Sequence, residues 1–519
     1  MAKSENRSKF LPIVLIIILG FAVYGNSLNG KFIWSDCALV RDNVYIKDSR
    51  YIPNLFTEDI GSGAGIKSNS YRPLQMLTYM IDYRLWKLDV RGFHLTNILL
   101  HISVALVVYW LLNILYNDRF LSLLTSILFV VHPVQTEAVA YISGRADPLS
   151  SLFVLLCFIL YIKGLRSKNL IVYALALISL AFALLSRENS LVLPVLLVLL
   201  HYIFRQRIEA KTFLPILVIA FIYILLRFTL LSYLLPITSS AGTIFARLPG
   251  FLVAITNYTR LLLFPFGLHM EYGHKTFSFI DLRAILGLII LFGGLIYAFR
   301  KRKQNRLLFF SISWFFIALL PQSNLYPINA YMAEHWLYLP SIGFFLILAR
   351  GLTSIYVAKN LKGPAIVSIM SILVFYSFLT IKQNNYWKQP IVFFERTLKY
   401  VPDSPELHNN LGIAYAEAGR KEEAITSYKK AIVLNPDYAM AYFNLGNAYS
   451  SLGNRPEAIT SYKKAIELNP GYAKAYYNLA TIYYEEKQYE LALDYYRKAM
   501  ELGHKIQLEF LGVLNDYLL

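Results

Sequence analysis

Apolar runs of 17 or more residues recur between Leu11 and Ile381, and short polar segments separate them. A helix rises about 1.5 Å per residue, so runs of this length match the ~30 Å hydrocarbon core of a bilayer. The pattern predicts an all-α, polytopic helical bundle with about eleven membrane spans. We place the spans near residues 11–28, 95–116, 120–131, 147–164, 169–185, 190–204, 213–235, 281–299, 307–320, 338–357 and 364–382.

One further apolar segment, residues 244–266, would break the alternation of sides if it crossed the membrane. It contains Pro249, Asn257, Thr259 and Arg260, which are costly at the bilayer centre. We therefore expect an interfacial or re-entrant helix in this segment.

After about Asp403 the sequence turns polar and repeats itself at a spacing of 34 residues. Small and aromatic residues recur in register, which is the tetratricopeptide pattern of paired helices that cross closely. We predict a membrane domain at 1–385, a linker helix at 386–404, three repeats and a terminal capping helix at 507–519. The repeats are 405–438, 439–472 and 473–506, and their aligned positions are Leu411/Leu445/Leu479, Tyr415/Tyr449/Tyr483, Ala424/Ala458/Ala492, Tyr428/Tyr462/Tyr496 and Ala431/Ala465/Ala499.

Composition agrees with this division, since 56% of the 519 residues are hydrophobic and mean hydropathy is +0.47. From Asp403 onward there are 12 Lys or Arg and 15 Asp or Glu, so the whole net charge of +18 belongs to the membrane part. Its basic residues are spread over short loops, which is the positive-inside pattern and not a nucleic-acid-binding patch. This places the N-terminus inside and the repeats outside.

The basic, apolar N-terminal segment lacks a small-residue cleavage site, so we expect a retained first helix. Cys157 lies within an apolar run and Cys37 is the only other cysteine, so no disulfide framework is expected.

The predicted topology puts every polar cluster of interest on the non-cytoplasmic side. The stretch "HPVQTEAVAYISGRADPL", from His132, lies between two apolar runs. Arg145, Arg187 and His132 are candidates to bind phosphate oxygens, and Asp36 in the first loop is a candidate general base.

Other polar residues of the same loops are expected to line this site. They are Glu137, Asp147, Tyr71, Arg72, Asn97, His101, Glu188, Glu334 and His335. The chain shows no metal-binding motif, Walker motif or dinucleotide fingerprint, so we expect neither a metal nor a cofactor.

Some of these residues have structural interpretations as well. The structural interpretation of Asp36 is that it caps a helix on the outer side or pairs with Arg41. Arg145 and Asp147 are spaced to form an ion pair that ends the loop and caps the following span.

Two more interpretations stay open. Glu137 lies where it would orient His132, and His94, Asn97 and His101 share one helix face, where interhelical hydrogen bonding is as expected as donor contact.

Taken together, the motifs resemble one family, the transmembrane and tetratricopeptide-containing O-mannosyltransferases of the GT-C superfamily. The resemblance covers nearly the whole chain in the same order. It rests on Asp36 with Arg41–Asn43 after it, "YRPL", "FHLTNILLH", "HPVQTEAVAYISGRADPL", "LSRENS", "AEHWLYLPSIGF" and the repeats.

The resemblance implies transfer of a sugar, expected to be mannose, from a polyprenyl (dolichyl) phosphate to Ser/Thr hydroxyls of proteins. It also implies an extracytoplasmic or lumenal site, a first-loop acid as base and inversion at the sugar carbon. This sequence departs from the family at Ser35, where an aspartate commonly precedes the Asp36 position, and at Arg187, where lysine is common. The repeats are expected to bind the protein or peptide acceptor.

Other classes of function remain open. A transporter or lipid-sugar flippase would show two similar halves and polar groups inside the spans, which this sequence does not. A membrane-anchored scaffold or assembly factor would need only the repeats. A transferase acting on a glycan would leave a protein-binding domain unexplained.

Overall fold

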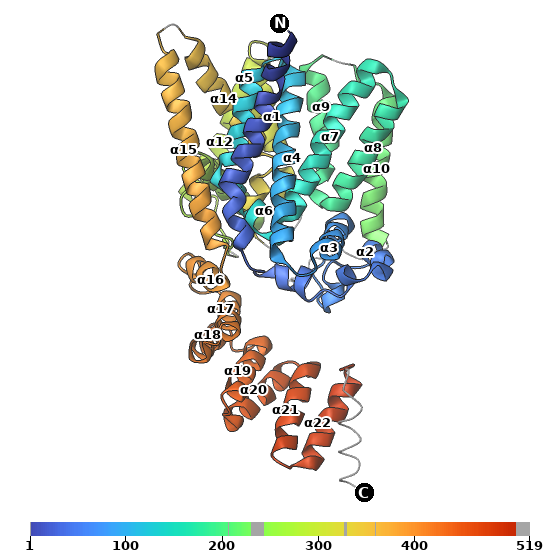
Figure 1. The fold of residues 1–519 in the computed structure, drawn as a ribbon, viewed down its shortest axis with the longest axis vertical. Coiled ribbons are helices and arrows are strands. Elements are labelled where there is room, and N and C mark those ends of the chain that lie inside the picture. The colour runs from blue at the N-terminus through green and yellow to red at the C-terminus, as the bar shows by residue number, and fades with distance from the viewer. Residues whose placement is uncertain are drawn as a thin grey trace. The chain divides into compact units, whose positions relative to one another are not determined.

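The computed structural model describes residues 2–205, 207–229, 243–273, 275–325, 328, 330–358 and 360–504. The chain forms two compact units, Met1–Gln389 and Pro390–Leu519. Across the described residues the regular structure of both units is helical (Figure 1). The predicted all-α architecture, a membrane-type bundle followed by tetratricopeptide repeats, is confirmed.

The first unit contains fifteen α-helices in its described part. They are α1 (Ala2–Tyr24), α2 (Ile52–Thr57), α3 (Pro73–Trp86), α4 (Val90–Tyr116), α5 (Arg119–Val131), α6 (Thr136–Ala140), α7 (Ala146–Ser167), α8 (Leu170–Ser186), α9 (Leu193–Ile203), α10 (Ala210–Thr229), α11 (Ile244–Leu263), α12 (Leu282–Lys301), α13 (Arg306–Ala318), α14 (Ser341–Val357) and α15 (Lys362–Tyr386).

Each predicted span corresponds to an apolar helix within the described residues, and the helices differ in length. Residues 230–235 of the predicted span at 213–235 lie outside the described residues. In the described parts of the chain, six helices are long and apolar enough to cross a membrane by length and composition, and α5 with the segment after it forms a seventh candidate bent by 56°. The helices α8, α9, α13 and α14 match predicted spans but are shorter. The number eleven therefore stays a prediction. Among the described residues, α11 is not a candidate span, and its interfacial role also stays a prediction.

Polar caps fix where the short helical connections turn. The Asp118 side chain accepts a hydrogen bond from the Leu121 amide at the start of α5, and Asn169 caps α8 in the same way. Asn117 and Lys168 end the preceding helices in the left-handed conformation. Because caps satisfy amides that a helix start leaves unpaired, tight turns can join consecutive helices at these points.

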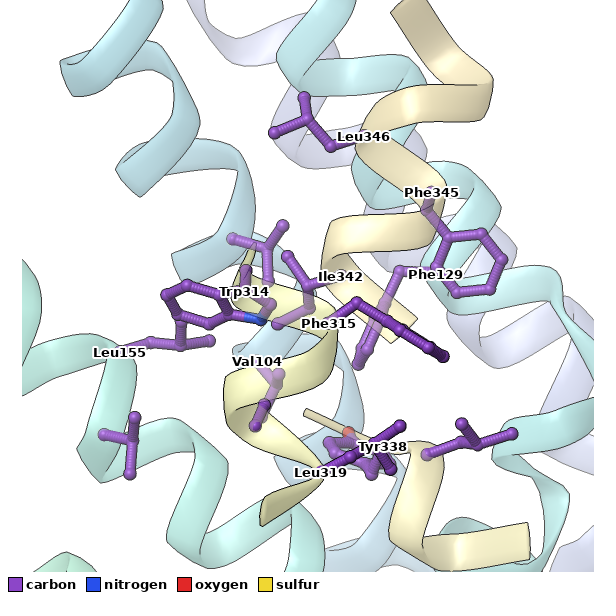
Figure 2. Packing of buried hydrophobic residues seen from close by; sticks show 14 of the residues in the cluster. Val104, Phe129, Leu155, Trp314, Phe315, Leu319, Tyr338, Ile342, Phe345 and Leu346 are labelled. Carbon is purple, nitrogen blue, oxygen red and sulfur yellow. The ribbon is translucent and has the colours of Figure 1, made fainter. Parts of the chain in front are cut away.

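Aromatic packing joins α5, α13 and α14 in the core of the bundle (Figure 2). Phe129 makes edge contacts with the rings of Tyr338 and Phe345, and its ring stacks on His101. Trp314 is buried and donates its indole N–H to the Leu339 carbonyl at 3.0 Å. These contacts hold the segment before α14 against the end of α5.

The first loop, with α2 and α3, lies at the end of the bundle opposite the N-terminus (Figure 1). The final helix of the bundle ends there too, because Asn384 donates to the Val23 carbonyl at 2.9 Å and Asn26 donates to the Asn385 side chain at 3.2 Å. The chain thus leaves the first unit at the end where the first loop lies, as the predicted topology requires.

The second unit begins with α16, inside the predicted linker, and continues through residue 504 as three helix pairs. Its helices are α16 (Pro390–Leu398), α17 (Pro405–Glu417), α18 (Lys421–Leu434), α19 (Ala439–Ser451), α20 (Arg455–Leu468), α21 (Ala473–Glu485) and α22 (Tyr489–Glu501). The predicted capping helix at 507–519 lies outside the described residues.

Small residues let the helices of each repeat approach closely. A Cβ atom at Gly412 would lie 2.5 Å from the Tyr428 ring, and one at Gly446 would lie 2.7 Å from the Tyr462 ring. Ala480 occupies the corresponding position of the third repeat and is fully buried. The small residue recurs at this position because the two helices of each repeat approach closely there.

Two glycines of α12 allow a direct test of helix packing. A Cβ atom at Gly287 would clash with the backbone carbonyl of Leu252 on α11, whereas one at Gly293 would meet open space. We expect Gly287→Ala to destabilise the bundle by about 1–3 kcal/mol, because backbone cannot move aside easily. Thermal unfolding in detergent would measure it, and Gly293→Ala is the control. Equal midpoints for both variants would contradict this packing.

Candidate active site

A buried polar segment, residues 132–147, leads from the end of α5 into the first turn of α7. It consists of two 3-10 turns, η6 (Pro133–Gln135) and η7 (Ile142–Arg145), with α6 between them. All of its residues are buried except Ser143, which is half-buried. Gly144 approaches the Glu137 carbonyl so closely that a side chain has no room. Irregular backbone at membrane depth is tolerated where protein covers it and its polar groups are paired.

The side chains of this segment contact several different helices and loops. Gln135 donates to Ser341 at the start of α14 at 2.9 Å. Ser143, Arg145 and Asp147 contact the first loop, the pair α3–α4 and the residue after α8, in that order. The segment therefore brings together the first loop, the residue after α8 and the start of α14.

Asp36 of the first loop lies against Ser143. One carboxylate oxygen accepts hydrogen bonds from the Ser143 amide at 2.8 Å and from its hydroxyl at 2.6 Å, and the other accepts from the Ile33 amide at 3.1 Å. Asp36 is 1% exposed. Burial raises its pKa to about 7, although these hydrogen bonds oppose the rise. A carboxyl that titrates near neutral pH is suited to proton transfer.

Arg145 is wholly buried and fully engaged. Its guanidinium lies 2.6 Å from the Asp82 carboxylate, and it donates to the Asn97 side chain at 2.7 Å and the Phe93 carbonyl at 2.9 Å. It also lies over the Tyr79 ring. The anticipated pair with Asp147 does not form. Phosphate binding by Arg145 stays a prediction, and this geometry weighs against it because a ligand has no access.

Buried histidines connect helices. Nε2 of His132 lies 3.1 Å from the Leu262 carbonyl, and its Nδ1 accepts from the Val134 amide, so neither nitrogen faces a ligand. Nδ1 of His101 lies 2.7 Å from the Tyr338 hydroxyl. Because both ring nitrogens of His132 are paired inside the protein, this geometry weighs against phosphate binding by His132, which stays a prediction. The contacts of His101 fit its interpretation as an interhelical hydrogen-bonding residue.

Asn97 lies on α4, one turn before His101. Its side chain donates to the Tyr141 carbonyl at 3.0 Å and to the Val139 carbonyl at 3.2 Å. His94, one turn earlier, is buried with neither ring nitrogen hydrogen-bonded. Asn97 therefore supports the irregular backbone of the polar segment.

Three arginines and two carboxylates form a second charged group, the arginine cluster. It consists of Arg72, Arg187, Arg227, Asp147 and Glu188. Arg72 lies 3.0 Å from Glu188, Arg227 lies 3.7 Å from the same carboxylate, and Arg187 pairs with Asp147. Nε of Arg187 is buried without a hydrogen-bond partner. With ordinary ionisation the cluster carries one net positive charge, so it has capacity for an anion.

The surroundings of the arginine cluster leave little empty space. A cavity of about 20 Å³ lies beside Asp147, Ser190, Gln322 and Trp336, room for about one water molecule. An anion entering here would compete with the two carboxylates for the arginines.

Glu137 pairs with His335 and not with His132. Its carboxylate lies 2.6 Å from Nδ1 of His335 and accepts the His335 amide at 2.9 Å. Glu334, one residue earlier, is buried and accepts from the His269 amide and the Tyr272 hydroxyl, both at 2.6 Å. The two neighbours therefore face different partners.

Two predicted residues differ in their contacts with the site. Tyr71 is buried and donates to the Phe56 carbonyl at 3.0 Å, which ties it to the first loop. Arg72, the next residue, belongs to the arginine cluster.

Sequence reasoning missed three members of the site. Asp82, Ser143 and Arg227 were not singled out, although each contacts a residue that was. Asp82 carried a usable signal, since it is an acid on the apolar helix α3 of the first loop. Arg227 lies within the predicted span at 213–235. An ionisable residue inside a membrane span is a functional candidate by default. Ser143 carried no signal.

The fold and site define a polytopic helical membrane protein with tetratricopeptide repeats and a buried charged centre at one end of its bundle. The family models "TPR repeat" and "Tetratricopeptide repeat" match residues 414–453, and residues 439–472 and 473–505, respectively.

Along most of its length the chain is similar to protein O-mannosyl-transferases. It is 28% identical to the Caenorhabditis elegans protein O-mannosyl-transferase F38B6.6 over 83% of this chain and 64% of that protein. It is 28% identical to mouse protein O-mannosyl-transferase TMTC3 over 81% of this chain and 51% of that protein. The resemblance drawn from the motifs is therefore confirmed.

The chain spans about half to two thirds of the length of these curated relatives. Among solved structures, a crystal structure of MamA aligns with 30% of this chain and 85% of its own, at 26% identity and a TM-score of 0.21.

The Arg145–Asp82 pair predicts a large effect on stability. Arg145→Ala would leave the Asp82 carboxylate buried and uncompensated, at a cost of about 3–5 kcal/mol. Arg41→Ala breaks an exposed pair with Asp42 and should cost less than about 1 kcal/mol. The yield and unfolding midpoint of each purified variant would measure the difference. Similar losses for both variants would show that burial of Arg145 does not matter.

Proposed function

We propose that this chain transfers mannose from a polyprenyl-phosphate carrier to Ser/Thr hydroxyls of proteins, as an inverting transferase of the GT-C type. The observation that carries the proposal is the arginine cluster, which four separate segments assemble at the end of an apolar bundle. Similarity to protein O-mannosyl-transferases supports protein O-mannosylation as the reaction. A lipid phosphate is the kind of anion that could reach the arginine cluster from the membrane.

In the proposed site Arg187 and Arg72 bind the donor phosphate, and Arg227 adds a third positive charge. The guanidinium fork matches phosphate oxygens, and the unpaired Nε of Arg187 supplies a donor that no protein group uses. When the bond from C1 to the phosphate breaks, the leaving phosphate gains negative charge. Cations held in place therefore stabilise the transition state more than the bound donor.

An apolar cavity is suited to part of the polyprenyl chain. It has a volume of about 170 Å³ and lies among α11, α12, α13 and α14, where Leu262, Ile290, Phe316 and Phe344 are among its lining residues. The small cavity beside Asp147 is lined by the same α13–α14 region. Hydrocarbon and phosphate would then both be bound near this pair of helices.

Charge and architecture support the proposed side of the membrane and the proposed role of the repeats. Basic clusters concentrate at the predicted cytoplasmic loops, which supports an extracytoplasmic or lumenal site. The chain leaves the bundle at the end where the first loop lies, so we assign acceptor binding to the tetratricopeptide unit. A scaffold without catalysis would leave a net positive cluster, in which Arg187 and Asp147 are buried and the other three residues are half-buried, without use.

The experiment uses purified chain in nanodiscs with radiolabelled polyprenyl-phosphate mannose and an acceptor protein. We expect the wild type to label Ser/Thr residues. Arg187→Gln should raise the donor KM by about 10- to 100-fold, since a charge-assisted phosphate contact is lost. Arg283→Gln, in an exposed pair with Asp281, is the control. No labelling by the wild type with any polyprenyl-phosphate sugar would favour the scaffold.

If Asp36 is the base, its raised pKa predicts how the rate of sugar transfer depends on pH. A base must be ionised, and the raised pKa of Asp36 means that its ionised fraction grows as pH rises through about 7. Turnover at saturating donor should therefore rise between pH 6 and pH 8, and Asp36→Asn should lose about 100-fold or more. A folded Asp36→Asn variant with full turnover would restrict Asp36 to anchoring Ser143.

A further inference from the structure

The first loop presents Asp36 on a tight turn, residues 33–36, which we call the Asp36 turn. Trp34 of this turn has a φ of 54°, in the left-handed region that bulky side chains rarely adopt. The Asp36 amide donates to the Ile33 carbonyl at 3.0 Å, and the Ile33 amide donates to the Asp36 carboxylate at 3.1 Å. A residue in such a conformation persists only where its surroundings hold it. The contacts of the turn therefore fix the direction of the Asp36 side chain.

Tyr141 of the buried polar segment makes one of these contacts. Its hydroxyl accepts a hydrogen bond at 3.2 Å from the amide of Ser35, the residue between Trp34 and Asp36. Two residues further on, the amide and hydroxyl of Ser143 donate to the Asp36 carboxylate. The polar segment thus contacts the Asp36 turn at two points, through its backbone at Ser35 and through its carboxylate.

Tyr141 is in turn fixed by its backbone and its ring. Its carbonyl accepts from Asn97 on α4. Its ring packs on the indole of Trp387, with the ring centroids 5.3 Å apart and the planes inclined by 32°, and both residues are buried. Trp387 directly follows α15, and the carbonyl of the next residue, Lys388, accepts the Lys31 amide at 3.1 Å. The chain after α15 therefore lies against both Tyr141 and the start of the first loop.

We propose that Tyr141 is a positioning residue for Asp36, and that Trp387 holds Tyr141 in the place this role requires. The inference rests on the proposed function, in which Asp36 receives the proton of the acceptor hydroxyl. Tyr141 takes up no proton in this role. Its hydroxyl holds the Ser35 amide, which keeps Trp34 left-handed and so keeps the Asp36 carboxylate directed at the acceptor.

A positioning role differs from a purely structural one in what it changes. Within the described residues, no hydrogen bond or ring contact joins Tyr141 to the arginine cluster, where the proposed function places the donor phosphate. Loss of the Tyr141 hydroxyl should therefore lower kcat and leave the donor KM unchanged. A purely structural residue would lower the yield of folded chain, and each folded molecule would keep its kcat.

The experiment measures kcat and donor KM in nanodiscs for Tyr141→Phe, Trp387→Leu and Trp387→Phe. The control is Tyr173→Phe on α8, which also loses a hydroxyl bonded to backbone, the Thr212 carbonyl at 2.6 Å. Circular dichroism and unfolding midpoints establish that each variant is folded. Hydrogen–deuterium exchange of the peptide that covers the Asp36 turn reports the Ser35 amide without any need for turnover.

We expect Tyr141→Phe and Trp387→Leu to lower kcat by about 10-fold, with donor KM within about 2-fold of the wild type, because a small misplacement of a reacting group is costly. Both variants should exchange the Ser35 amide about 10-fold faster. Trp387→Phe, which keeps an aromatic ring beside Tyr141, should stay within about 3-fold of the wild-type kcat. Tyr173→Phe should change neither kcat nor exchange at the turn.

Trp34→Gly tests whether Tyr141 acts through the turn. Glycine adopts a positive φ at no steric cost, so the turn in this variant depends less on the Tyr141 hydroxyl. Adding Tyr141→Phe to Trp34→Gly should lower kcat by less than about 3-fold, compared with about 10-fold in the native background.

A folded Tyr141→Phe variant with wild-type kcat, or with unchanged exchange of the Ser35 amide, would overturn the proposal. Equal losses of kcat in the native and Trp34→Gly backgrounds would overturn it as well, because Tyr141 would then not act through the turn. Wild-type chain that transfers no sugar, while Tyr141→Phe exchanges the Ser35 amide faster, would contradict the proposed function and leave the contact between Tyr141 and the Asp36 turn standing.

Discussion

A guanidinium buried inside an apolar bundle needs a carboxylate and a full set of hydrogen-bond acceptors. The contacts that give Arg145 these partners determine how the chain is arranged at this end of the bundle. Asp82, Asn97 and the Phe93 carbonyl surround it, so one side chain joins the polar segment to α3 and α4. An unpaired charge there would cost several kcal/mol. With Arg145 fixed, its neighbours along the segment are fixed as well, and Ser143 meets the first loop while Asp147 meets the residue after α8.

The same segment contributes one residue to each of two charged groups, Arg145 to the first and Asp147 to the second. On one side, Arg145 has every partner it can use and a ligand has no access. On the other side, the arginine cluster has one more cation than anion and an unpaired nitrogen on Arg187. Full pairing gives rigidity, and incomplete pairing leaves capacity for a charged substrate. The proposed chemistry depends on this contrast, because the rigid side holds the incompletely paired side in place.

Much of the architecture could be predicted because it follows from local patterns. Apolar length located the helices, and the 34-residue period located the repeats. The polar loops could be assigned to one side because basic residues marked the other. Partners could not be predicted, since Arg145 and Asp147 are two residues apart yet pair with Asp82 and Arg187, far away in sequence. The predicted site residues His132 and His101 contact the Leu262 carbonyl and the Tyr338 hydroxyl, partners far away in sequence, and their roles in the site stay predictions. Ionisable residues in apolar helical segments, such as Asp82 on α3 and Arg227 within the predicted span at 213–235, were the signal that sequence reasoning left unused.

The most direct test of a lipid-phosphate site at the arginine cluster is an experimental structure of the chain in nanodiscs with a non-transferable polyprenyl-phosphate mannose analogue. The predicted result places the phosphate within hydrogen-bond distance of Arg187 Nε and the Arg72 guanidinium, with at least one of the Asp147 and Glu188 carboxylates displaced. Arg145 keeps its contact with Asp82 in that structure. A phosphate bound to Arg145, or bound away from both Arg72 and Arg187, would contradict the division between the rigid and the incompletely paired sides.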